Sequence, residues 1–106
     1  MPGEISVQRL KARRDAGEHP LVIDVRESWE LEVARLEDVL HIPMNEIPQR
    51  LAELDRERET IVMCRSGGRS LRVAQFLEQQ GVRSVLNLTG GILAWAQDID
   101  PRVPSY

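Results

Sequence analysis

Short apolar runs that alternate with helical segments constrain the fold of this chain most strongly. The runs cover residues 21–25, 39–42, 60–63 and 84–87, and each contains Val, Ile or Leu. They show no alternation of polar and apolar side chains, which is typical of strands buried on both faces of a parallel sheet. Because segments with helical periodicity separate them, the sequence predicts an α/β fold with a mostly parallel sheet and right-handed crossovers.

The segments between these runs carry helix signals. Ser6 and Ser28 are predicted N-caps of the first two helices, and Gly17 and Gly81 are placed to end the first and fourth. The predicted helices cover residues 7–16, a stretch beginning at 28, and residues 47–54, 69–80 and 92–99. Residues 101–106 are predicted to form an extended tail.

The composition excludes several classes of protein. Of the 106 residues, 42% are hydrophobic and 29% charged, so we expect residues 1–106 to form a single globular domain. A net charge of −3 gives no reason to expect nucleic-acid binding. No apolar run approaches the roughly 18 residues of a membrane span, and the first residues do not read as a signal peptide. We therefore expect a cytoplasmic protein with no membrane partner.

The single cysteine, Cys64, lies in the segment that carries chemistry. One cysteine excludes an intramolecular disulfide and a four-cysteine zinc site. Cys64 follows a predicted strand and precedes a predicted helix, with Gly67 and Gly68 in the loop between them. Glycines permit a loop that turns its N–H groups inward, and the helix N-terminus adds partial positive charge. Arg65 and Arg69 add two full charges.

These features predict a reactive thiolate in a cradle that also suits an anion. All of them favour the charged sulfur, so we expect the pKa of Cys64 to lie below the free value of about 8.5. The alternative is a small buried hydrophobic residue beside an ordinary turn, a common setting for a lone cysteine.

Four segments of the chain resemble rhodanese-domain sulfurtransferases, in the right order. The loop Cys64-Arg65-Ser66-Gly67-Gly68-Arg69-Ser70 resembles the active-site loop of that family. The other matching segments are Asp24-Val25-Arg26-Glu27, His41-Ile42-Pro43 and Gly90-Gly91-Ile92-Leu93-Ala94-Trp95. The end of the chain, Asp100-Pro101 and Val103-Pro104-Ser105-Tyr106, is similar to rhodanese domains fused to molybdopterin-synthase-activating enzymes.

The resemblance implies a fold and a reaction. It implies a five-stranded, mostly parallel sheet flanked by helices, and a catalytic Cys64 that carries sulfane sulfur as a persulfide. The donor would be a small anion such as thiosulfate, and the acceptor cyanide, a thiol or a sulfur-carrier protein. No metal or organic cofactor would be needed. The residues implied to bind substrate are Arg65, Ser66, Gly67, Gly68, Arg69 and Ser70.

Several residues near the predicted strand ends have a structural interpretation. We expect Asp24 and Arg26 to form an ion pair or a hydrogen-bond anchor for the loops beside the site. His41 is expected to be packed or hydrogen-bonded rather than a base. Asp38 stands where the family usually has Gly, and Arg35 where it often has His. These departures put the shape of one pocket wall and the donor preference in doubt.

Two other functions share this fold class. Cysteine phosphatases and arsenate reductases use a Cys-x5-Arg loop, whereas Cys64 and Arg69 are separated by four residues. The shorter loop favours a single sulfur atom over a phosphoryl group. A non-enzymatic docking or redox-sensing module is the remaining alternative, because a lone thiolate can be oxidised and later reduced by an external thiol.

Overall fold

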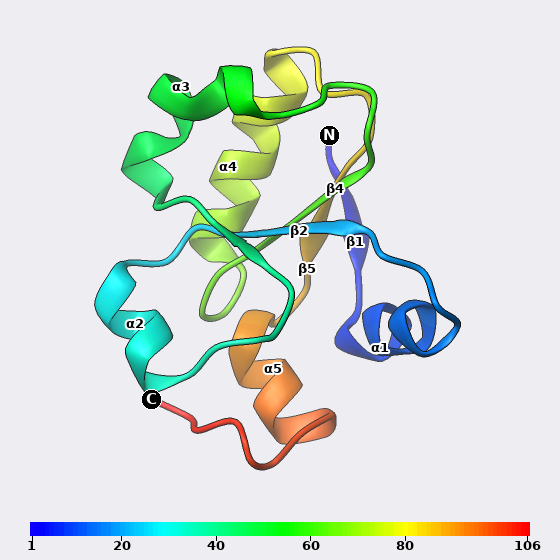
Figure 1. Ribbon diagram of the computed structural model, residues 1–106, viewed down its shortest axis with the longest axis vertical. Helices are drawn as coiled ribbons and strands as arrows, with labels where there is room; N and C mark the ends of the chain where they lie inside the picture. Colours follow the sequence, from blue (N-terminus) through cyan, green and yellow to red (C-terminus); the bar gives the residue numbers. More distant parts are fainter.

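Five parallel strands form one sheet at the centre of the molecule. The computed structural model describes residues 1–106. Its strands are β1 (Gly3–Ile5), β2 (Leu21–Asp24), β3 (Leu40–His41), β4 (Thr60–Met63) and β5 (Val85–Leu88), in the order β1-β5-β4-β2-β3 (Figure 1). All four pairings are parallel. The predicted α/β class and parallel sheet are confirmed.

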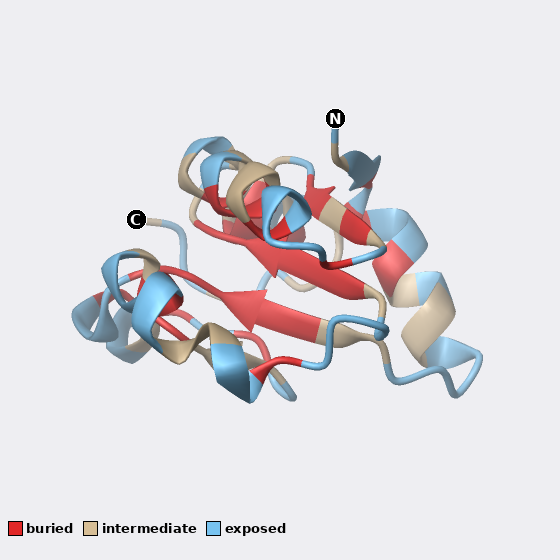
Figure 2. Ribbon diagram, turned by 90° about the horizontal axis from the view of Figure 1, so that it is seen from above, coloured by how far each residue is buried: buried red, intermediate tan, exposed pale blue.

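Helices cover both faces of the sheet. They are α1 (Val7–Asp15), α2 (Ser28–Val33), α3 (Ile47–Arg50), α4 (Gly68–Gln79) and α5 (Gly91–Asp98), with 3₁₀ turns η1 (Met44–Glu46) and η2 (Leu51–Glu53). One core cluster joins α3 and α4 to the sheet, and the other joins α1 and α5 to its opposite face. The buried strands lie between these layers, whose outer surfaces are exposed (Figure 2).

Strand β4 contributes to both cores by the alternation of its side chains. Ile61 and Met63 pack in the cluster under α1 and α5, whereas Val62 and Cys64 pack in the cluster under α4. Successive side chains of a strand point to opposite faces, so a strand without polar alternation must be covered on both sides. This alternation also directs Cys64 toward the α4 side.

The structure corrects three details of the predicted elements. Strand β1 was not predicted, because Gly3–Ile5 is too short to show a pattern and gains its strand partners only from β5. Ser28 is the first residue of α2, and the N-cap is Glu27, which forms a capping box with Glu30. The predicted helix over 47–54 is divided into α3 and η2. The predicted Ser6 cap is confirmed, since its side chain accepts a hydrogen bond from the Arg9 N–H at 3.0 Å.

The last segment of the chain returns toward α2 after α5 ends. Figure 1 shows residue 106 beside α2, and Val103 and Tyr106 are partly buried against the core on that side. None of the helices is both long enough and apolar enough to cross a bilayer.

The start of α5 packs directly on the loop that follows β4. The N–H of Ile92 donates to the carbonyl of Cys64 at 3.0 Å, and the N–H of Leu93 donates to that of Arg65 at 3.1 Å. Gly91 approaches the same carbonyls with φ of 57°. A Cβ there would lie 2.6 Å from the Arg65 oxygen and still closer to the Cys64 oxygen. Glycine at this position therefore allows α5 to support the loop.

We predict that Gly91→Ala is markedly more destabilising than Gly17→Ala. Both residues have positive φ, but a Cβ at Gly17 meets nothing within 4 Å. The two variants share a left-handed backbone penalty of roughly 1 kcal/mol, and Gly91→Ala adds an overpacking cost of about 1–3 kcal/mol. Denaturant unfolding of both variants measures the difference. Equal losses of stability would show that α5 does not depend on this close approach.

Candidate active site

Cys64 lies at the carboxyl end of the central strand β4 and is buried, with 1% of its surface exposed. The N–H of Gly67 donates to its Sγ at 3.1 Å, and the Ser70 Oγ lies 3.3 Å from the same atom. Gly67 reaches this position with φ of 115°, which a side chain would disfavour. The loop therefore wraps its main chain around the sulfur, as the sequence predicted.

The surroundings of the sulfur lower the pKa of Cys64 below its ordinary value. Burial is the largest influence and raises the pKa, because it penalises the charged form. Hydrogen bonds from the Ser70 hydroxyl and from the main-chain N–H groups of Ser70, Gly67 and Ser66 together outweigh burial. The predicted direction is confirmed, although close hydrogen bonds rather than the arginines are the leading causes.

Arg69, in the first turn of α4, is held by a buried carboxylate. Its Nη1 and Nη2 donate to the two oxygens of Glu30 at 2.7 and 2.8 Å. This bidentate bond is the main reason that the pKa of Glu30 falls to about 2. The charge of Arg69 is therefore shared between the sulfur loop and α2.

Arg65 is held by the last residue of the structure. Its Nε donates to the main-chain oxygen of Tyr106 at 2.6 Å, and its Nη2 bonds to the same atom. The guanidinium carbon lies 5.1 Å from the centroid of the Tyr106 ring, a cation–π arrangement. Both arginines follow Cys64 closely in the sequence, but each side chain is already hydrogen-bonded, Arg65 to Tyr106 and Arg69 to Glu30.

Asp24 and Arg26 form the predicted ion pair. Their side chains are fully buried and joined at 2.7 Å. Arg26 also donates to the Ala34 carbonyl at 2.9 Å and to the Tyr106 hydroxyl at 2.8 Å. That hydroxyl in turn donates to Glu30 at 2.8 Å. One connected network therefore joins β2, α2, the tail and Arg69.

Sequence reasoning missed Glu30, Tyr106 and Asn87 as parts of this site. Asn87, on β5, accepts a hydrogen bond from the Ser70 Oγ at 2.5 Å and donates to the Gly67 carbonyl at 3.1 Å. An asparagine inside an otherwise apolar strand was the available signal. The only tyrosine, in a polar tail, was the signal for Tyr106.

The remaining predicted residues are exposed or have structural partners. Ser66 and Gly68 are exposed. The Nε2 of His41 is 2.6 Å from the Arg26 carbonyl oxygen, as expected of a hydrogen-bonded histidine. Asp38 and Arg35 are exposed, and Asp38 has φ of 56°, a conformation that explains why glycine suits this position.

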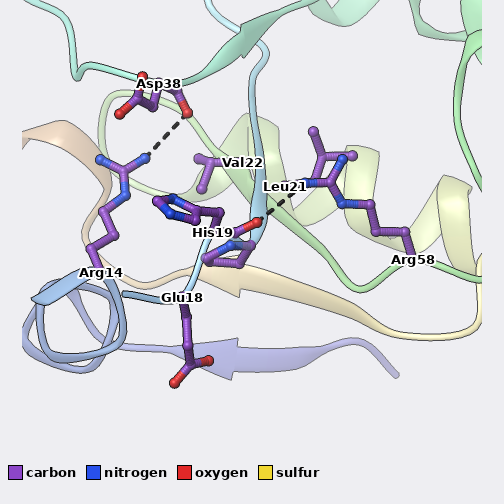
Figure 3. Close-up of a pocket in the computed structure, with 8 residues that line it drawn as sticks. Arg14, Glu18, His19, Leu21, Val22, Asp38 and Arg58 are labelled. Carbon is purple, nitrogen blue, oxygen red and sulfur yellow. Dashed lines mark hydrogen bonds between the residues drawn. The ribbon is translucent and has the colours of Figure 1, made fainter. Parts of the chain in front are cut away.

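A cavity of about 390 Å³ opens where the strands begin, at the end of the sheet opposite to Cys64 (Figure 3). Leu21, at the start of β2, lines it and pairs with Thr60 at the start of β4, whereas Cys64 follows the end of β4. The cavity also includes Asp38, but its lining has no cysteine. Because the nucleophilic side chain is at the other end of the strands, we place the candidate active site at Cys64.

Comparisons with known proteins show which family this sequence belongs to. The family model for the Rhodanese-like domain matches residues 6–98. A sulfurtransferase of Allochromatium vinosum is 40% identical over 97 residues, covering 92% of this chain and 91% of the relative. The adenylyltransferase and sulfurtransferase MOCS3-2 of Zea mays is 30% identical over 96% of this chain but only 23% of its own length.

Solved structures with the same fold belong to the same family. A rhodanese-like domain protein from Staphylococcus aureus superposes with a TM-score of 0.83 at 28% identity, covering 88% of this chain and 90% of that one. The chain therefore belongs to the rhodanese-like family of sulfurtransferases.

Proposed function

We propose that this protein transfers sulfane sulfur from a small anionic donor such as thiosulfate to a thiophilic acceptor, with Cys64 as the carrier. The observation that supports this most strongly is the buried Cys64 Sγ, which the N–H of Gly67 approaches at 3.1 Å. Donors aimed at a sulfur stabilise its anion, and the same groups can stabilise the outer sulfur of a persulfide.

The proposed reaction has two displacement steps. In the first, the Cys64 thiolate attacks the outer sulfur of thiosulfate, the S–S bond of the donor breaks, and sulfite leaves with the electron pair. In the second, a nucleophile such as cyanide attacks the outer sulfur of the persulfide, and the Cys64 thiolate leaves with the electron pair to restore the enzyme. This is covalent, ping-pong catalysis.

The two loop arginines and the loop backbone would bind the donor. A dianion that approaches Cys64 can recruit Arg65 from the Tyr106 carbonyl and share Arg69 with Glu30. The main-chain N–H groups from Arg65 to Ser70 would surround the transferred sulfur. Because Glu30 carries a full negative charge beside Arg69, it sets a limit on how strongly the site attracts an anion.

The acceptor would come from another molecule. The 106 residues contain no second cysteine that could resolve the persulfide as a disulfide. A small thiol, cyanide or a sulfur-carrier protein fits this requirement. The Zea mays relative, whose name combines adenylyltransferase and sulfurtransferase, supports the transfer of sulfur itself.

We predict that Cys64→Ser abolishes transfer from thiosulfate to cyanide without unfolding the protein. Serine replaces the sulfur by an oxygen that cannot carry a persulfide. Thiocyanate formation measures transfer, and thermal unfolding reports the fold. If the folded variant keeps wild-type turnover, the covalent mechanism is wrong.

We predict that Arg65→Ala lowers kcat/KM for thiosulfate by about tenfold, the size expected for one charge-assisted hydrogen bond of about 1.4 kcal/mol. A monoanionic alkyl persulfide donor should lose less, because it presents a smaller charge. Arg83→Ala is the matched control, since that side chain is 74% exposed and pairs only with Glu57. An equal loss with both donors would contradict an electrostatic role for Arg65.

We predict the opposite effect for Glu30→Gln. The amide removes the negative charge that engages Arg69, so KM for thiosulfate should fall by up to about tenfold. Glu57→Gln, at an exposed ion pair, is the control for charge alone. Steady-state kinetics at constant ionic strength measures the change, and a KM that stays the same or rises would show that Glu30 does not compete with the donor.

A further inference from the structure

The Ser70 hydroxyl lies between two atoms that can each accept a hydrogen bond from it. Its Oγ is 3.3 Å from the Cys64 Sγ and 2.5 Å from the Asn87 Oδ1. All three residues are buried, with exposed fractions of 1% for Cys64, 0% for Ser70 and 6% for Asn87. A serine hydroxyl has a single hydrogen. It can therefore satisfy only one of the two acceptors at a time.

The orientation of the Asn87 amide decides which of the two acceptors receives the hydrogen bond from Ser70. Its Nδ2 donates to the Gly67 carbonyl at 3.1 Å, so its Oδ1 must face Ser70. A carbonyl oxygen carries no hydrogen, and the short Oγ–Oδ1 contact therefore requires Ser70 to be the donor. The lone pairs of the Ser70 oxygen are then free to accept a hydrogen bond from the Cys64 thiol.

Ionisation of the thiol changes this arrangement. The thiol proton leaves to water, and the thiolate then needs donors. Ser70 can donate to the sulfur only if its hydroxyl turns away from Asn87. The hydrogen bond gained by the thiolate is therefore partly offset by the one that Asn87 loses.

We infer that Asn87 is a positioning residue, which holds the Ser70 proton away from Cys64 and so governs how readily the thiol ionises. No part of the proposed catalytic loop includes Asn87, since it lies on β5 and acts through Ser70 and Gly67. Its effect on ionisation does not depend on the transferred group.

The titratable groups on the elements beside Cys64 bond to other partners, and none of them bonds to Ser70. Those from the loop, α4, α2, β2 and the tail are Arg65, Arg69, Glu30, Asp24, Arg26 and Tyr106. The Nε2 of His41, from β3, faces the Arg26 carbonyl. Substitution of Asn87 leaves these pairs in place.

The consequence for sulfur transfer rests on the proposed function. A thiolate with a lower pKa is a weaker nucleophile per molecule but a better leaving group. By raising the pKa, Asn87 would make each thiolate a stronger nucleophile and a poorer leaving group, and would lower the fraction of Cys64 that is ionised at a pH below that pKa. In the persulfide the inner sulfur carries no full charge, so the Ser70 proton can stay with Asn87.

The test measures the pKa of Cys64 in the whole protein by the pH dependence of its alkylation with iodoacetamide, which reports this thiol alone because the chain has no other cysteine. We expect Asn87→Ala to lower that pKa by about one unit, because the Ser70 hydroxyl can then donate to the thiolate without breaking a hydrogen bond to Asn87. In the Ser70→Ala background, Asn87→Ala should cause no further shift. Asn87→Leu, which fills more of the buried space, should show the same shift as Asn87→Ala and serves where alanine impairs folding.

The double variant separates positioning from simple support of the loop. If Asn87 acted only by holding the Gly67 carbonyl, its shift would persist in the Ser70→Ala background. Persistence of the shift, or a rise of the pKa in Asn87→Ala, overturns the inference. The alkylation needs no sulfur donor, so failure of thiosulfate to load Cys64 would refute the proposed function without affecting this result.

Discussion

Hydrogen bonds to the sulfur of Cys64 are the constraint on which the candidate site depends. Cys64 is 1% exposed, and burial on its own would keep a thiol protonated. Hydrogen bonds from the Ser70 hydroxyl and from the main-chain N–H groups of Ser70, Gly67 and Ser66 reverse that preference. They can do so only because β4 ends at this point, the loop turns through a left-handed glycine, and α4 begins immediately after it. The parallel sheet supplies the position of Cys64, and the loop and the first turn of α4 supply the hydrogen-bond donors.

A second set of interactions fixes the loop from outside. The Arg69–Glu30 pair ties α4 to α2, and the buried Asp24–Arg26 pair anchors the end of β2. Tyr106 connects both pairs and also holds Arg65. The arginines that would attract an anion are therefore already ordered by carboxylate and carbonyl oxygens. These partners order the arginines before a donor binds, and they also temper the positive charge available to it, because a donor would have to recruit Arg65 from Tyr106 and share Arg69 with Glu30.

The sequence was informative wherever local pattern determines structure. The apolar runs predicted the parallel sheet, and the glycines beside Cys64 predicted an inward-facing loop, because both depend on neighbouring residues. Strand β1 could not be found this way, since Gly3–Ile5 becomes a strand only by pairing with β5. The same limit applies to the site. Glu30 is 39 residues from Arg69, Tyr106 is 76 from Glu30, and Asn87 is 17 from Ser70, so only the fold brings these partners together.

Intact mass measurement of the protein after incubation with thiosulfate, and again after cyanide, tests the covalent mechanism most directly. The covalent mechanism predicts a gain of roughly 32 Da, one sulfur atom, which maps to Cys64 and disappears with cyanide. No gain from thiosulfate or from a low-molecular-weight persulfide, while Cys64 remains reduced and open to alkylation, would contradict it and favour a docking or redox-sensing role for this thiol.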